Sequence, residues 1–245
     1  MSQPSRAPRV TVLGVAGEVL LTLGVVVGLF VVWQLWWTNL DATAAQEEAV
    51  TEMAQQFDAS APAAGRAELD FGEPIVAQAP GYGQGLGIVY IPRFGSDYAR
   101  PIMEGTGADV LDTLGLGHYE GTAMPGEVGN FAVAGHRQTN GKVLDLIHTL
   151  EAGDRIHVRT AAGYYVYVVE EHEIVMPSEV RVVASNPQEP QSEPVRKLMT
   201  MTSCHPRFGD TERYVVHAVL ESWRPAQAGP PAEIAAVVAR DTPGS

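Results

Sequence analysis

The segment "MTMTSCHPRFGDTERYVVHA" contains Cys204, the only cysteine of the chain, and Arg213 nine positions later. Two apolar stretches, "KLMTMTSC" and "RYVVHAVLESW", flank a loop with Pro206 and Gly209, a pattern typical of a β-hairpin. If the hairpin closes symmetrically, Cys204 lies opposite Arg213, with the two Cβ atoms about 5 Å apart on one face. A guanidinium beside a thiol stabilises the thiolate and can hold the oxyanion formed when sulfur attacks a carbonyl. We therefore predict a nucleophilic site for acyl transfer.

Acyl transfer also needs a group that carries a proton to the leaving amine, and histidine suits this role near neutral pH. His136, in "GNFAVAGHRQTNG", lies where an apolar strand enters a loop, a common position for reactive side chains. We predict His136 as the proton carrier. His217, four positions from Arg213 and on the same strand face, is the alternative. His205 adjoins Cys204 but points to the opposite face.

Three other histidines indicate neither a metal site nor a cofactor. His148 and His157 fall in a helical and an alternating strand pattern, where solvated or packed roles are expected. His172, within "EEHE", lacks a second ligand cluster such as H-E-x-x-H. We expect no metal and no cofactor.

The order of His, Cys and Arg in "AGHR", "TMTSC" and "RYVVHA" resembles the sortases, membrane-anchored cysteine transpeptidases of Gram-positive bacteria whose active-site strand reads T-L-x-T-C or similar. "GLGHYEGTAMPGEVGNFAVAGHR" and "TSCHPRFGDTERYVVHA" are similar to class E sortases of actinobacteria, and the resemblance covers residues 86–223. Met201 stands where Leu is common in the family, and Ser203 where Thr is common. Neither departure removes a reacting group.

The resemblance implies that Cys204 attacks the Thr–Gly carbonyl of an L-A-x-T-G or L-P-x-T-G sorting signal on a secreted protein. His136 would protonate the leaving Gly amine, and Arg213 would hold the developing oxyanion. An amine of a peptidoglycan precursor or of a pilin would then accept the thioester. The similarity to class E sortases also implies a preference for L-A-x-T-G over L-P-x-T-G. In that class the preference is associated with an active-site tyrosine. Tyr119 is the candidate for it, and Thr202, on the strand face of Cys204, is a candidate for the signal groove; ordinary packing is the alternative for both.

Two alternatives assign Cys204 differently. L,D-transpeptidases are also exported, β-rich and cysteine dependent, but their motif resembles S-H-G-C-x-R. Here Ser203 precedes Cys204, and Arg207 follows three positions later. The non-enzymatic alternative is a membrane-tethered β-barrel that binds cell-wall components, with Cys204 packed as a small hydrophobe.

Short apolar stretches separated by Gly, Pro and Asp turns dominate residues 85–225, which we expect to be the catalytic domain. "GKVLDLIHTLEAGD" has apolar residues at roughly helical spacing and predicts a helix, while "TAAGY" predicts a hairpin turn. Many short strands with few helices predict a mostly β fold, a closed sortase-like β-barrel with one or two short helices.

Residues 19–40 carry no formal charge, and a helix of this length crosses a hydrocarbon core of about 30 Å. Arg6 and Arg9 precede it and Asp41 follows it, so residues 1–18 should be cytoplasmic and the remainder exported. We predict a single-pass anchor in the cell membrane that begins after Glu18. A cleaved signal peptide is the alternative, which the length of the apolar stretch and the lack of an A-x-A-like site disfavour.

The flanking segments and the overall charge complete the prediction. Residues 41–84 are rich in Ala, Gln and Glu, which predicts a stalk that buries little surface, with a possible helix at 45–57. Residues 226–245 predict a disordered tail with a short helix at 233–240. The net charge of −13, with 14 Arg and 2 Lys, excludes a nucleic-acid surface. A single cysteine excludes an intramolecular disulfide.

Overall fold

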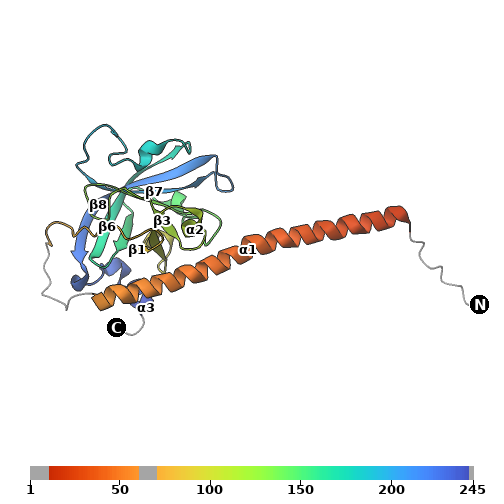
Figure 1. The fold of residues 1–245 in the computed structure, drawn as a ribbon, viewed down its shortest axis with the longest axis horizontal. Helices are drawn as coiled ribbons and strands as arrows, with labels where there is room; N and C mark the ends of the chain where they lie inside the picture. The colour runs from red at the N-terminus through yellow and green to blue at the C-terminus, as the bar shows by residue number, and fades with distance from the viewer. Residues whose placement is uncertain (1–10, 61–70, 243–245) are drawn as a thin grey trace, which may run out of the picture. The chain divides into compact units, whose positions relative to one another are not determined.

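The computed structural model describes residues 11–60 and 71–242, without the side chains of residues 34–36 and 38. The chain divides into an N-terminal unit that ends at Thr38 and a second unit that begins at Asn39. One helix, α1 (Val12–Ser60), supplies residues to both units. The strands all belong to the second unit, which Figure 1 shows as a barrel.

Eight strands close into a barrel in the order β1-β2-β3-β4-β7-β8-β6-β5. Their bounds are Gly85–Tyr90 for β1, Ala99–Glu104 for β2, Leu116–His118 for β3, Gly129–Ala134 for β4, Arg155–Arg159 for β5, Gly163–Val175 for β6, Lys197–His205 for β7 and Glu212–Pro225 for β8. Two pairs, β2 with β3 and β4 with β7, are parallel, and the other pairs are antiparallel. The predicted closed β-barrel is confirmed.

Strand β7 shows why the reactive residue lies outside the barrel core. Met199 and Met201 are fully buried in the main apolar cluster. Because successive side chains of a strand point to opposite faces, Thr200, Thr202 and Cys204 lie on the other face. The alternation "MTMTSC" therefore fills the barrel with methionine and presents hydroxyls and the thiol outside it.

Short helical segments connect the strands: η1 (Pro92–Phe94), α2 (Ala108–Leu111), η2 (Ile147–Thr149) and η3 (Val180–Val183). The helix predicted in "GKVLDLIHTLEAGD" is wrong, since only the 3₁₀ turn η2 forms there. Its apolar residues Val143, Leu144, Ile147 and Leu150 are nevertheless all buried in the main apolar cluster. The spacing of these apolar residues therefore results from consecutive turns that place their side chains in the core, and not from a regular helix.

The N-terminal unit contains a stretch that is long and apolar enough to cross a membrane, Val12–Trp33, with mean hydropathy 2.4. None of this stretch is buried within the protein. It begins earlier than the predicted residues 19–40 and includes Glu18, which we expected to precede it. The difference arises because the apolar residues 12–17 are already helical.

The helical segment 39–60, in contrast, packs on the barrel. Val50, Met53, Ala54 and Phe57 are buried in a second apolar cluster, and their spacing makes one continuous helix face. A possible helix at 45–57 is confirmed within α1, but the expectation that residues 41–60 bury little surface is wrong. The expectation failed because the average composition of residues 41–60 is polar, while the buried apolar residues form only a narrow face of the helix. Residues 61–70 of the predicted stalk lie outside the described residues.

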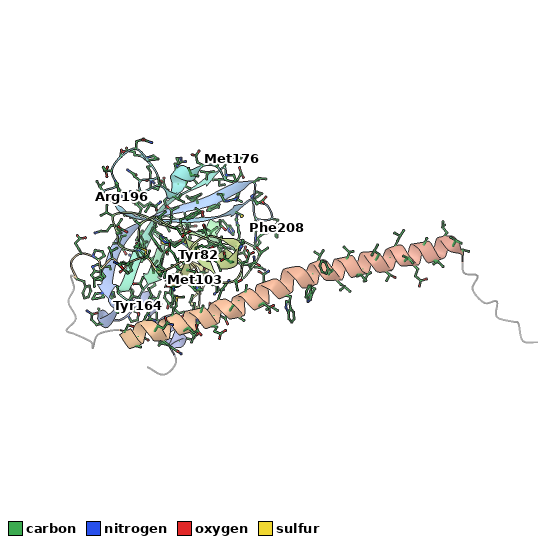
Figure 2. All side chains as sticks on the ribbon, in the orientation of Figure 1. Tyr82, Met103, Tyr164, Met176, Arg196 and Phe208 are labelled. Carbon is green, nitrogen blue, oxygen red and sulfur yellow. The ribbon has the colours of Figure 1, made fainter. Side chains whose placement is uncertain are left out.

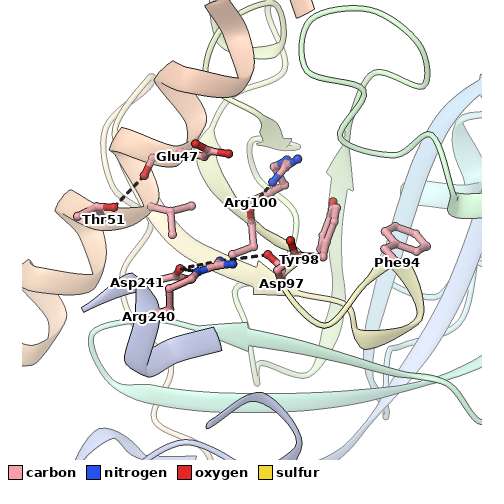
Figure 3. A pocket seen from close by; sticks show the side chains of 10 residues that line it. Glu47, Thr51, Phe94, Asp97, Tyr98, Arg100, Arg240 and Asp241 are labelled. Carbon is pink, nitrogen blue, oxygen red and sulfur yellow. Dashed lines mark hydrogen bonds and ion pairs between the residues drawn. The ribbon is translucent and has the colours of Figure 1, made fainter. Parts of the chain in front are cut away.

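The C-terminal segment is also folded, so the prediction of a disordered tail is wrong. After β8 come η4 (Ala226–Ala228), η5 (Ala232–Ile234) and α3 (Ala235–Asp241), which confirms a short helix. Ile234, Val237 and Val238 are buried in the second apolar cluster. Arg240 donates a hydrogen bond of 3.1 Å to the carbonyl of Asp97, at the rim of a cavity of about 500 Å³ (Figure 3). Residues 243–245 lie outside the described residues.

Candidate functional site

The parallel pair β4–β7 brings two of the predicted site residues together. Ala134 of β4 pairs with Thr202 of β7. His136 follows Ala134 by two residues, and Cys204 follows Thr202 by two residues. The two side chains therefore lie at the same end of these neighbouring parallel strands. The Gly135 amide donates to the Thr202 carbonyl over 3.1 Å, which continues the pairing beyond β4. The Ser203 hydroxyl donates to the Gly135 carbonyl over 2.7 Å, so the position where Thr is common keeps a bonding hydroxyl.

The hairpin β7–β8 supplies the third residue in the predicted register. Cys204 pairs directly with Arg213, which confirms the symmetric closure expected from the sequence. Arg213 Nη1 donates to the carbonyls of Asp210 and Glu212 over 2.8 and 2.9 Å. Among the described residues, Arg213 Nε and Nη2 have no hydrogen-bond partner. The guanidinium is therefore anchored at one end while its other donors remain available to a ligand.

Cys204, His136 and Arg213 line one cavity of about 280 Å³, which we call the cysteine cavity. Cys204 is a free thiol of intermediate burial, and the His136 side chain is 27% exposed. Residues far apart in the chain thus converge on a sulfur that a ligand can reach. The arrangement offers a nucleophile, an imidazole and a guanidinium around one space, the groups that acyl transfer requires.

Asp112 is a residue of this site that the sequence reasoning missed. It follows α2 directly, and its Oδ1 accepts a hydrogen bond of 2.7 Å from His136 Nε2. Because Nε2 donates to the carboxylate, Nδ1 is the ring nitrogen left to accept or release a proton. No local pattern links an aspartate to a histidine 24 positions later, and only the fold brings the two together.

Arg137 is a second missed residue, and it connects the two reactive segments. Its side chain is buried, and Nη1 lies 3.2 Å from the Cys204 carbonyl and 2.9 Å from His205 Nδ1. The guanidinium also lies over the Tyr214 ring, 5.6 Å from its centroid. Burial lowers the pKa of Arg137, an effect to which the nearby Arg207 charge adds. Arg137 thereby holds the end of β7 against the loop that carries its neighbour His136.

Tyr119 and Thr202 both line the cysteine cavity and contact each other. The Tyr119 hydroxyl and Thr202 Oγ1 are 2.9 Å apart, so the two candidates form one hydrogen-bonded pair. Together with Arg213 they also line an adjoining cavity of about 120 Å³. The two cavities therefore adjoin at these three residues, and together they are here called the groove.

The alternative histidines do not line the cysteine cavity. His217 is buried, and both its ring nitrogens are hydrogen-bonded, Nδ1 to Thr200 and Nε2 to Glu173. His205 contacts Arg137, and His172 stacks on an aromatic ring. His217 is therefore wrong as an alternative to His136.

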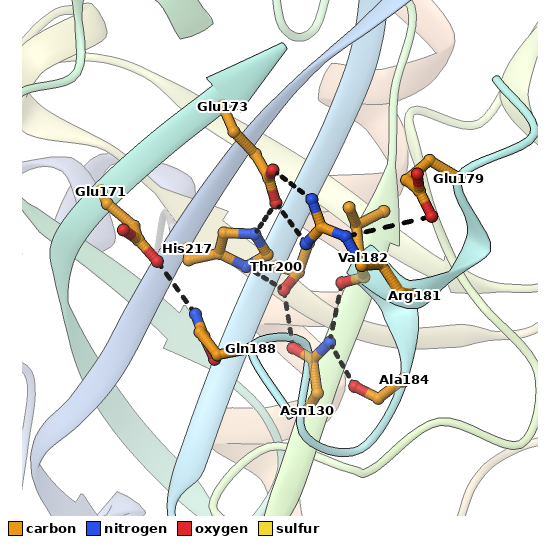
Figure 4. Close-up of polar contacts among 10 residues, drawn as sticks. All are labelled: Asn130, Glu171, Glu173, Glu179, Arg181, Val182, Ala184, Gln188, Thr200 and His217. Carbon is orange, nitrogen blue, oxygen red and sulfur yellow. Dashed lines mark hydrogen bonds and ion pairs between the residues drawn. The ribbon is translucent and has the colours of Figure 1, made fainter. Parts of the chain in front are cut away.

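Residues 176–184 are here called the η3 wall, and six of them line the smaller cavity: Met176, Pro177, Glu179, Val180, Val182 and Val183. A partly buried polar network ties this wall to the barrel (Figure 4). Asn130 Nδ2 donates to the carbonyls of Val182 and Ala184 over 3.2 and 3.0 Å. Glu173 accepts two hydrogen bonds from Arg181, at 3.0 and 2.6 Å. Since barrel strands supply Asn130 and Glu173, the network fixes the distance between the wall and the barrel.

The network has a definite pH dependence. Hydrogen bonds from Arg181, and then from His217, hold the pKa of Glu173 below its usual range. A carboxyl whose folded-state pKa is depressed stabilises the fold above its unfolded pKa, and it loses that contribution as the pH falls through the folded value. Acidification through this pKa should therefore release the η3 wall.

Replacing Arg181 with methionine should raise KM for a substrate bound in the groove several-fold, because the wall loses its bidentate tether. The unfolding free energy should change by no more than about 1 kcal/mol, since the Arg181–Glu173 pair is partly exposed. We expect KM of the unchanged protein to rise on acidification, and this rise should be weaker in the variant. Arg196→Met, which removes a comparable pair with Glu170 outside the wall, is the matched control. Equal KM values for the two variants would contradict this role of the network.

Comparisons with known proteins agree with this geometry. The Sortase domain family matches residues 89–221 of the chain. The chain is 35% identical over 222 residues to sortase SrtE1 of Streptomyces coelicolor, covering 88% of this chain and 59% of that protein. The chain thus spans less than two thirds of the length of this relative.

Two solved structures show the same fold with high coverage. The SrtA sortase from Actinomyces oris is 41% identical, with a TM-score of 0.64, covering 66% of this chain and 94% of that structure. Sortase E1 from Streptomyces coelicolor, solved with a tripeptide in its active site, is 35% identical, with a TM-score of 0.57, covering 64% and 99%. The resemblance to class E sortases is therefore confirmed, and the chain belongs to the sortase family of cysteine transpeptidases.

Proposed function

We propose that this chain cleaves a sorting signal of the L-A-x-T-G or L-P-x-T-G kind between Thr and Gly, and transfers the substrate protein to an amine. The observation that carries this proposal is the convergence of Cys204, His136 and Arg213 on one open cavity. The amine belongs to a peptidoglycan precursor or to a pilin.

In the first half of the reaction, the thiolate of Cys204 attacks the Thr carbonyl carbon, and the electron pair of the carbonyl moves onto its oxygen. The free donors of Arg213 hold this oxyanion, which is stabilised more strongly than the uncharged carbonyl. The tetrahedral intermediate then collapses, and the C–N bond to Gly breaks. His136, protonated on Nδ1, gives its proton to the departing amine, and a thioester remains on Cys204.

In the second half, the acceptor amine attacks the thioester carbonyl and passes a proton to the now neutral His136. The second intermediate again places its oxyanion on Arg213. Collapse breaks the C–S bond, forms the new amide and returns the thiolate with imidazolium His136. Asp112, which accepts from Nε2, keeps the ring oriented in both halves.

The groove supports a peptide signal lying from Cys204 toward the η3 wall. The tripeptide in the active site of Streptomyces coelicolor sortase E1 shows that a relative accepts a short peptide. In this chain the Tyr119–Thr202 pair lies at the boundary of the two cavities. We therefore assign this pair to recognition of the residue that distinguishes L-A-x-T-G from L-P-x-T-G.

The direct test incubates the full chain in detergent with a panel of L-x-x-T-G peptides and an amine, followed by mass spectrometry. We expect an acyl adduct on Cys204 and an amide product, with L-A-x-T-G preferred. Tyr119→Phe and Thr202→Val should each reduce that preference. Because the two hydroxyls share one hydrogen bond, the double variant should reduce it no further. A folded protein that forms neither adduct nor product with any peptide would refute the proposed function.

The apolar stretch near the N-terminus supports a location at the cell membrane. We propose a single-pass anchor in which the residues before Val12 lie in the cytoplasm and the catalytic barrel lies outside the cell. Alkaline carbonate extraction should leave the intact chain in the membrane pellet, because a spanning helix is held by the bilayer core. Recovery of uncleaved protein in the supernatant would contradict the anchor.

A further inference from the structure

The loop that carries His136, residues 135–142, has a strained conformation. Asn140, Gly141 and Lys142 are three consecutive residues with positive φ, at 51°, 86° and 52°. For residues other than glycine this left-handed conformation is unfavourable. Contacts from outside the loop are therefore needed to keep it in one shape.

Helix α1 supplies those contacts from within the second unit. The Gly141 amide donates to Asn39 Oδ1 over 3.0 Å, and Gln46 Nε2 donates to the Asn140 carbonyl over 3.1 Å. Gln46 is completely buried. A Cβ atom added at Gly141 would lie 2.5 Å from Gln46 Oε1, so the loop backbone lies directly against this side chain. The helix thus satisfies polar groups at two consecutive strained residues.

The same loop residue is bonded to the group that orients His136. Asn140 Nδ2 donates to Asp112 Oδ1 over 2.9 Å, and this oxygen also accepts from His136 Nε2 over 2.7 Å. Gln46, Asn140, Asp112 and His136 therefore form a continuous series of hydrogen bonds from the helix to the imidazole. A shift of Asn140 would remove one of the two donors that hold the carboxylate in place.

We propose that Gln46 and Asn39 of helix α1 are positioning residues for His136, and that the helical segment 39–60 is part of the catalytic unit. This inference rests on the proposed role of His136 in proton transfer. The helix acts on the orientation of the imidazole through the loop and Asp112, and it contacts no substrate. Its loss should slow the proton-transfer steps and leave peptide binding in the groove unchanged.

The test uses the full chain in detergent, with rates expressed per alkylatable Cys204. Gln46→Ala should lower kcat about tenfold, because small misplacements of a reacting group are costly, while KM for the peptide changes less than about twofold. Gln55→Ala, an exposed glutamine of the same helix, is the matched control and should match the unchanged protein. In an Asp112→Asn background, Gln46→Ala should have little further effect on kcat, since the two residues act in series.

Several outcomes would overturn the inference. One is a kcat of Gln46→Ala equal to that of Gln55→Ala. Another is an effect of Gln46→Ala that appears as a raised KM with kcat unchanged. The third is that the effects of Gln46→Ala and Asp112→Asn on kcat are fully additive. If Gln46→Ala does not fold, Asn39→Ala, at the partly exposed start of the segment, decides by the same criteria. Inactivity of the unchanged protein, or full activity of His136→Ala, would instead refute the proposed function itself.

Discussion

Replacing Cys204 with alanine should abolish both acyl-enzyme formation and transfer, with a fall in kcat of at least about 10⁴-fold. The reason is that the thioester is the only covalent link between the two halves of the proposed reaction. Because Cys204 is the only cysteine in the chain, alkylation of the native protein reports on this thiol alone. The unchanged protein should therefore be labelled once without denaturation, and the variant should not be labelled.

The Cys204→Ala variant should remain folded, since the side chain is only partly buried and makes no hydrogen bond to other described residues. An unchanged melting temperature is the control that separates loss of chemistry from loss of structure. Transpeptidation by this variant at the rate of the unchanged protein would exclude Cys204 as the nucleophile. Labelling of the native thiol only after denaturation would favour a non-catalytic barrel instead.

Replacing Arg213 with lysine should lower kcat/KM by about 10²–10³-fold, the range typical for removal of an oxyanion donor. Arg213 uses Nη1 to bond two carbonyls of its own loop and keeps Nε and Nη2 for the ligand. An ammonium is a single point charge and cannot do both. The effect should appear mainly in kcat and leave KM largely unchanged, since the oxyanion exists only in the transition state and intermediates.

Arg207→Lys is the matched control for this prediction. Arg207 lies in the same β7–β8 loop, is half exposed and pairs with Asp145 at 2.9 Å, but it does not line the cysteine cavity. Its replacement should change kcat/KM less than about twofold, as expected for an exposed ion pair. Normal turnover by Arg213→Lys would remove Arg213 from the mechanism.

The sequence by itself was sufficient to predict the barrel, the reactive Cys204, and His136 and Arg213 beside it. Strands of alternating pattern and a short loop between "KLMTMTSC" and "RYVVHAVLESW" specify a hairpin, so the pairing of Cys204 with Arg213 followed from local rules. The position of His136, where an apolar strand enters a loop, and then the resemblance to the sortases pointed to this residue, which the structure places on the same cavity. The strands and the Cys204–Arg213 pairing can be predicted from the sequence because strand alternation and hairpin register depend on residues that are close together in the chain.

Only the tertiary structure decided which segments outside those strands pack on the barrel. Residues 39–60 and 226–242 looked like a stalk and a tail because their average composition is polar, yet each places a few apolar side chains in a shared cluster. Asp112, Arg137 and Gln46 were missed for a related reason. Their partners lie 24 to 94 positions away along the chain, and a single polar contact at such a separation leaves no periodic pattern. Contacts of this kind are specified by the three-dimensional fit of the whole fold.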